Sequence, residues 1–124
     1  MAALVGLGGV GYSSADTSAT HPKVITVGSR FSLELGESAI VKGRGVKVTF
    51  AAVTDDSRCR PGQVCFWEGD ATVHLRLTKR HRTIPITLHT STQFNTTADA
   101  LGLRVRLIAL NTRGDVLTAR VDDI

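Results

Sequence analysis

The sequence predicts an all-β protein, an antiparallel β-sandwich or small barrel of about seven or eight strands with one local disulfide. Apolar residues recur with period two in short runs, and turn residues separate these runs. No segment shows sustained helical periodicity. The only two cysteines lie close together, on either side of a Pro-Gly pair.

The chain divides into two unequal parts. Residues 1–22 begin with an apolar run of small residues, followed by polar small residues, as in the second half of a secretory signal peptide. The usual basic residues before such a run are missing, so we interpret 1–22 as a truncated signal-like or disordered N-terminal segment. Residues 23–124 are predicted to form a single β-sandwich domain, whose length is usual for this architecture.

Composition restricts the classes of partner. The hydrophobic content of 42% indicates a globular chain, and the net charge of +4 makes it mildly basic. Most basic residues alternate with apolar ones along candidate strands, and no aromatic residues are interleaved with them. We therefore expect no nucleic-acid binding, and no apolar run is long enough to predict a transmembrane segment.

The candidate strands follow from the alternation of apolar and polar residues. They cover residues 24–27, 31–35, 39–41, 46–50, 73–78, 83–88, 101–107 and 116–121. A long loop is predicted over residues 55–69, and the polar stretch 91–100 is interpreted as a connection.

The clearest hairpin joins residues 73–78 to residues 83–88. If Thr78 pairs with Thr83, six apolar residues lie on one face, in the pairs Leu77–Ile84, Leu75–Ile86 and Val73–Leu88. Pro85 cannot donate to a strand ladder, so its strand should lie at a sheet edge or carry a bulge. The basic turn 79–82 is predicted to be a solvated hairpin tip.

Cys59 and Cys65 are predicted to form a disulfide, because Pro61-Gly62 can turn the chain between them. Closing so short a loop corresponds to roughly 2–2.5 kcal/mol in the chain-entropy model. Two alternatives are a metal site and two free thiols. The spacing is unlike that of zinc knuckles, and no close Cys-x-x-Cys redox pair is present.

The segment around these cysteines resembles a motif in a family of small, uncharacterised bacterial secreted proteins and lipoproteins. That motif is approximately Asp-Ser-Arg-Cys-Pro, four residues, then Cys-x-Trp-x-Gly-x-Ala, and the matching residues are Asp56, Ser57, Arg58, Cys59, Cys65, Trp67, Gly69 and Ala71. The pattern Phe-x-Leu-x-x-Gly-x-x-Ala at residues 31–39 is also similar to that family, and the resemblance covers roughly residues 30–110.

Two features depart from the family pattern. Proline follows Arg60 rather than Cys59, and no cysteine suitable for lipid attachment lies near the N-terminal run. The resemblance implies a β-rich bacterial domain outside the cytoplasm, either periplasmic or secreted. It implies no known activity.

Four carboxylates near the cysteines are weak candidates for a calcium site: Asp55, Asp56, Glu68 and Asp70. Their spacing does not match an EF-hand loop. The alternative is that these side chains cap turns and form ion pairs with Arg58 and Arg60.

His74 and His89 lie on the polar side of the predicted hairpin as diagonal neighbours, where two imidazoles can converge on a metal ion. A third ligand is not evident in the sequence, which favours solvent-exposed histidines. No nucleophile-elbow motif and no phosphate-binding glycine loop occur. We therefore expect no enzymatic activity and no cofactor.

The sequence favours an exported, non-enzymatic binding or structural module of the bacterial envelope, with a protein or another envelope component as partner. The candidate binding surface consists of Arg58, Arg60, Phe66 and Trp67. One alternative is a metal-handling protein or enzyme that uses the carboxylates or the histidines named above. Another is a protease-inhibitor-like module with Arg60 as specificity residue, although Pro61 directly after it fits a cleavage site poorly.

Trp67 is predicted to be mostly buried. A short bridged loop has no core of its own, so an indole two residues after Cys65 is expected to anchor the loop to the sandwich. The alternative is an exposed indole that serves as a contact for a partner.

Overall fold

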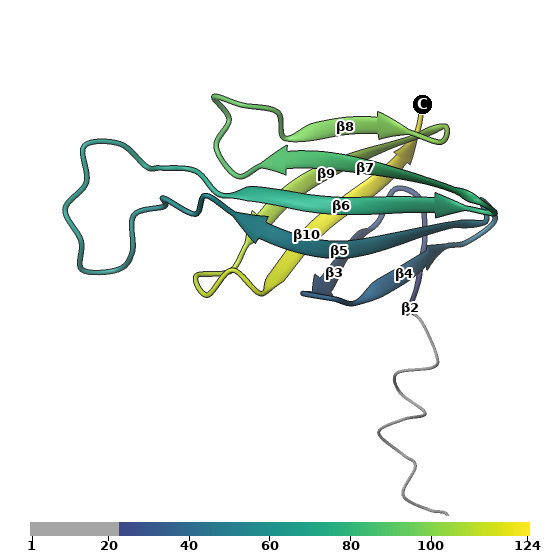
Figure 1. Ribbon diagram of the computed structural model, residues 1–124, viewed down its shortest axis with the longest axis horizontal. Coiled ribbons are helices and arrows are strands. Elements are labelled where there is room, and N and C mark those ends of the chain that lie inside the picture. The colour runs from purple at the N-terminus through teal and green to yellow at the C-terminus, as the bar shows by residue number, and fades with distance from the viewer. Residues whose placement is uncertain (1–22) are drawn as a thin grey trace, which may run out of the picture.

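The computed structural model describes residues 23–124, so the signal-like segment 1–22 lies outside the described residues. The described chain is all-β and contains nine strands (Figure 1). In chain order these are β2 (Lys23–Ile25), β3 (Arg30–Glu34), β4 (Ser38–Val41), β5 (Val46–Thr54), β6 (Thr72–Lys79), β7 (Arg82–His89), β8 (Thr97–Ala100), β9 (Leu103–Leu110) and β10 (Val116–Asp123).

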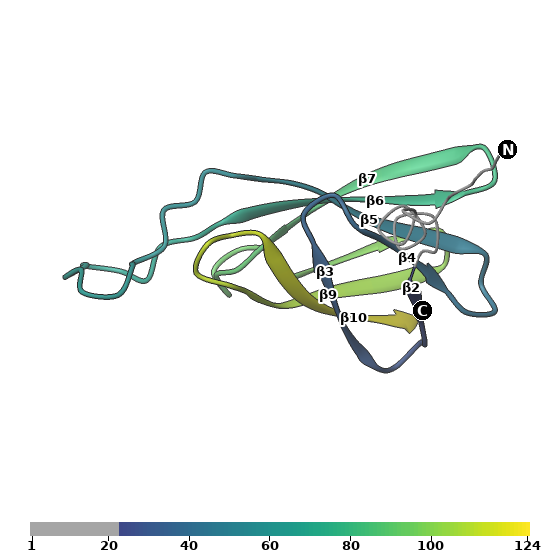
Figure 2. The same cartoon turned by 90° about the horizontal axis from the view of Figure 1, so that it is seen from below.

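The strands form two sheets packed as layers, which confirms the β-sandwich (Figure 2). The four-stranded sheet has the order β3-β10-β9-β8, and the five-stranded sheet has the order β2-β4-β5-β6-β7. Each sheet keeps two open edges, so the described chain is not a closed barrel. All neighbouring strands are antiparallel except β2 and β4, which run parallel.

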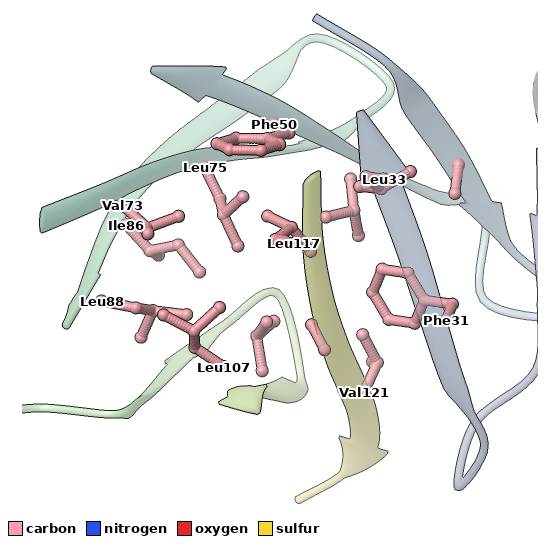
Figure 3. Close-up of a cluster of buried hydrophobic side chains, with 14 of the residues drawn as sticks. Phe31, Leu33, Phe50, Val73, Leu75, Ile86, Leu88, Leu107, Leu117 and Val121 are labelled. Atoms are coloured by element: carbon pink, nitrogen blue, oxygen red, sulfur yellow. The ribbon is translucent and has the colours of Figure 1, made fainter. Parts of the chain in front are cut away.

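The core lies between the two sheets and is built by the predicted alternation. In β6, Val73, Leu75 and Leu77 are buried, while the intervening side chains reach the surface. β9 and β10 contribute their alternate residues from the opposite layer (Figure 3). Interdigitated aliphatic and Phe side chains of two inner faces are typical of sandwich cores.

The hairpin of β6 and β7 has the predicted register, with Thr78 opposite Thr83. β7 is an edge strand, which confirms the expectation for Pro85, because a proline at an edge removes no ladder hydrogen bond inside the sheet. The tip at residues 79–82 is exposed, as expected. Arg80 there has a φ of 56°, which is unusual for a residue with a side chain.

Several elements differ from the sequence prediction, among them β9, which spans Leu103–Leu110 where the sequence predicts a strand over residues 101–107. The stretch 91–100 contains β8, which pairs with β9 and places Asp99 opposite Arg104. Its Thr-Ala-Asp-Ala sequence carries no large apolar side chain, so alternation did not reveal it. β5 extends to Thr54, beyond the predicted end at Phe50. Within residues 23–124, no helix is long and apolar enough to cross a membrane.

Candidate functional site

The connection between β5 and β6 projects beyond the body of the sandwich in both views (Figures 1 and 2). We call residues 55–71 the disulfide loop. Cys59 and Cys65 are bonded to each other, with their Cα atoms 6.0 Å apart, which confirms the predicted bridge. The bridge closes the outer part of the loop, away from the strands.

Arginine side chains hold the base of the loop. Arg58 donates from Nε to Oδ1 of Asp56 at 2.9 Å and from Nη2 to Oδ2 at 2.8 Å. Its Nη1 donates to the carbonyl oxygen of Leu110 at 2.8 Å, which ties the loop to the end of β9. Arg60 donates to the same carboxylate at 2.9 Å. Both cationic groups therefore have Asp56 as a partner, and the candidate binding surface of Arg58, Arg60, Phe66 and Trp67 stays a prediction.

These contacts shift the pKa values of Asp56 and Arg58. Hydrogen bonds from Arg58, and to a lesser extent from Arg60, hold the pKa of Asp56 well below its ordinary range despite opposition from partial burial. The same hydrogen bonding raises the pKa of Arg58. The ion pair is therefore retained over the whole physiological pH range.

The two arms of the loop lie against each other at Gly69. A Cβ at this position would stand 2.1 Å from the carbonyl oxygen of Ser57, and its φ of +78° also favours glycine. Ser57 N donates to Asp70 O at 2.7 Å, and Cys59 N donates to Glu68 O at 3.1 Å. Most of the motif residues around the cysteines thus build the base of the loop.

The apolar side chains after the turn lie on the surface. Val64 and Phe66 are fully exposed, and Trp67 is 47% exposed. The prediction that Trp67 is mostly buried is therefore wrong, and the indole is absent from the core cluster. The Asp56–Arg58 pair and the backbone contacts at Gly69 hold the loop, so it does not depend on an aromatic anchor.

The four candidate calcium ligands do not converge. Asp56 faces the arginines, whereas Asp70 accepts from Ser91 N at 2.9 Å. Glu68 accepts from Ser91 Oγ at 3.0 Å, and Asp55 is exposed. Among residues 23–124, no three His, Cys, Asp or Glu side chains are grouped so as to hold a metal ion.

The two histidines also have separate partners. His74 Nε2 lies 2.8 Å from the hydroxyl of Thr54. His89 Nδ1 lies 2.6 Å from Oδ2 of Asp70, and its ring lies 5.2 Å from that of Phe94. The contact between His89 and Asp70 was not predicted from the sequence. The hairpin register could have indicated it, since His89 lies opposite Thr72, two residues after Asp70.

One shallow hollow lies beside the base of the loop, and a second, larger hollow adjoins it. The smaller, of about 310 Å³, is lined by Arg58, Glu68 and Ser91 among others. The larger, of about 490 Å³, lies over the four-stranded sheet and includes three arginines that the sequence analysis did not single out. Thr90 and Ile108 line both hollows.

The fold and this site define a small β-sandwich that carries a protruding, disulfide-closed loop with exposed apolar residues. No protein-family model, curated protein or solved structure matches the chain. The resemblance of residues 55–71 to the bacterial family motif stays a prediction.

Proposed function

We propose that this protein is an exported, non-enzymatic binding module of the bacterial envelope that contacts a partner protein through the tip of its disulfide loop. The observation that carries the proposal is the exposure of Val64, Phe66 and Trp67 on a loop whose base is fixed. Exposed apolar side chains grouped on a surface are typical of sites that bind another molecule.

The construction of the loop favours binding. Aromatic side chains, Trp above all, provide a large share of the binding energy in protein interfaces. A loop that is already ordered loses little conformational freedom when it binds. Here the bridge between Cys59 and Cys65, together with the Asp56–Arg58 ion pair, supplies that order.

Two further features support the proposal, one for a location outside the cytoplasm and one for a role without catalysis. A disulfide persists in oxidising compartments outside the cytoplasm, in agreement with the signal-like sequence of residues 1–22. The polar groups near the loop have structural partners, Asp56 with two arginines and Asp70 with His89. Arg60, the specificity residue of the inhibitor alternative, contacts Asp56, which argues against that alternative.

The test uses a photo-crosslinking amino acid at position 66 in the exported protein. Position 35 provides the control, because Leu35 is also an exposed apolar residue, at 49%, but lies outside the loop. We expect one protein to crosslink at position 66 and not at position 35. With that partner purified, Phe66→Ala/Trp67→Ala should weaken binding by about tenfold or more, and Leu35→Ala should leave it unchanged. Equal crosslinking at both positions, or equal affinity of the two variants, would overturn the proposal.

A further inference from the structure

The outer face of the four-stranded sheet carries three arginines in one row. In the strand register, Arg120 of β10 lies opposite Arg30 of β3 on one side and opposite Arg106 of β9 on the other. All three residues are exposed. We call these three residues the arginine row. Like charges directly opposite each other on a sheet destabilise it, so this arrangement is unfavourable for folding alone.

The neighbouring row on the same face is balanced. Arg104 lies between Asp99 and Asp122 in the register, and its Nε is 2.8 Å from Asp99. In the arginine row, only Arg120 has an acidic partner, Asp122 at 3.0 Å. Within residues 23–124, Arg30 and Arg106 form no ion pair. The row therefore keeps three positive charges beside one negative charge.

The larger hollow lies over this row. Arg30, Arg106 and Arg120 line it together with Thr90, Thr92 and Thr96 from the connection between β7 and β8. The hydroxyls of Thr92 and Thr96 add hydrogen-bond donors beside the guanidinium groups, whereas the hydroxyl of Thr90 already donates to Asp70. Asp122 also lines the hollow, where it is the one group that repels an anion.

We propose that the arginine row binds an oxyanion of the phosphate or sulfate class, carried on a larger molecule. The surplus of positive charge in the row favours an anion, and the guanidinium fork suits tetrahedral oxyanions. The hollow of about 490 Å³ has the size of a small-molecule site and exceeds the space of one oxyanion. This site is independent of the apolar tip of the disulfide loop.

Thermal unfolding followed by circular dichroism tests the proposal with inorganic phosphate and inorganic sulfate as probes. At matched ionic strength, either anion should raise the midpoint of the wild-type protein above that in sodium chloride, by about 4 °C or more at concentrations well above the dissociation constant. In Arg30→Gln/Arg106→Gln, this rise should be clearly smaller than in the wild type, because only the general stabilisation by these anions remains. Arg76→Gln/Arg82→Gln removes the same charge from the other sheet and should keep the full rise.

A second readout separates an anion site from general screening. Without phosphate or sulfate at low salt, Arg30→Gln/Arg106→Gln should melt at a higher temperature than the wild type, because repulsion within the row is relieved. A stabilisation by phosphate that is as large in this variant as in the wild type would overturn the proposal, because phosphate and sulfate also stabilise folded proteins generally. So would a wild-type response no larger than that to chloride.

Vesicles distinguish the source of the oxyanion. If the wild-type protein sediments with phosphatidylglycerol vesicles and not with phosphatidylcholine vesicles, and Arg30→Gln/Arg106→Gln abolishes this sedimentation, the bound oxyanion is a lipid headgroup. A response to phosphate without sedimentation would assign a free molecule that bears the group. Both results support the arginine row as the binding site.

Discussion

The guanidinium of Arg58 makes a two-pronged contact with the carboxylate of Asp56, with N–O distances of 2.9 and 2.8 Å, at the point where the disulfide loop leaves the sandwich. Both side chains are largely buried, and Arg58 also donates to the backbone of β9. The pair therefore connects the loop to the four-stranded sheet, although the loop itself joins two strands of the other sheet.

Replacing Asp56 by Asn should lower the free energy of unfolding by about 1.5–3 kcal/mol, because Arg58 loses a charged hydrogen-bond partner in a partly buried position. Urea unfolding measures this change. Asp99→Asn is the control, since it breaks an exposed pair with Arg104 that solvent screens, and its effect should be clearly smaller. Equal losses in the two variants would show that Asp56 has no special structural role.

The same carboxylate predicts a dependence on pH. The folded pKa of Asp56 is lowered, so its stabilising contribution is complete above its unfolded pKa of about 4 and is lost as the pH falls toward the folded value. We expect the stability of the wild-type protein to decline more steeply below about pH 4 than that of Asp56→Asn. If the stability of the two proteins declined equally with falling pH, folding would not lower the pKa of Asp56.

Gly69→Ala should destabilise the loop base strongly, by about 2 kcal/mol or more, because the new methyl group meets the backbone of Ser57 and the positive φ adds strain. Gly62→Ala is a matched control. Gly62 also has a positive φ, of +86°, but nothing lies within 4 Å of the added Cβ. The difference in unfolding free energy between the two variants measures the close approach alone, and no difference would refute it.

Trp67→Ala should change stability by only about 1 kcal/mol or less, far below the cost of about 3–5 kcal/mol for a core aromatic. The indole is half-exposed and lies outside the core cluster. Because this is the only Trp, native fluorescence should already lie near the solvent-exposed position and shift little on unfolding. A strongly blue-shifted native emission would indicate that the loop folds back onto the sandwich.

Arg80→Gly at the hairpin tip should raise stability by about 0.5–1 kcal/mol, because Arg80 adopts a positive φ that glycine adopts without strain. His81→Gly in the same turn is the control and should bring no gain. Lys79→Ser and Arg82→Ser should each change stability by no more than about 0.5 kcal/mol, as for exposed residues. Thermal unfolding separates the four variants, and destabilisation by Arg80→Gly would show that the tip is packed.

The sequence alone determined the features that depend on neighbours along the chain. Alternation identified most of the strands, and the register of β6 and β7 followed because a short turn leaves few ways to place six apolar residues on one face. The disulfide also followed, because Pro61-Gly62 lies between two cysteines that are close in sequence.

Only the tertiary structure decided the features that depend on which distant segments meet. β8 has no apolar pattern of its own and is recognised through its pairing with β9, while Trp67 stays at the surface because polar contacts at the loop base replace an aromatic anchor. The arginine row could not be predicted from the sequence either. Each of its residues lies on a predicted strand or at the border of one, but their alignment depends on β10 lying between β3 and β9. Alternation along a strand fixes which face a side chain occupies, whereas its neighbours across the sheet are set by pairing between segments far apart in the chain.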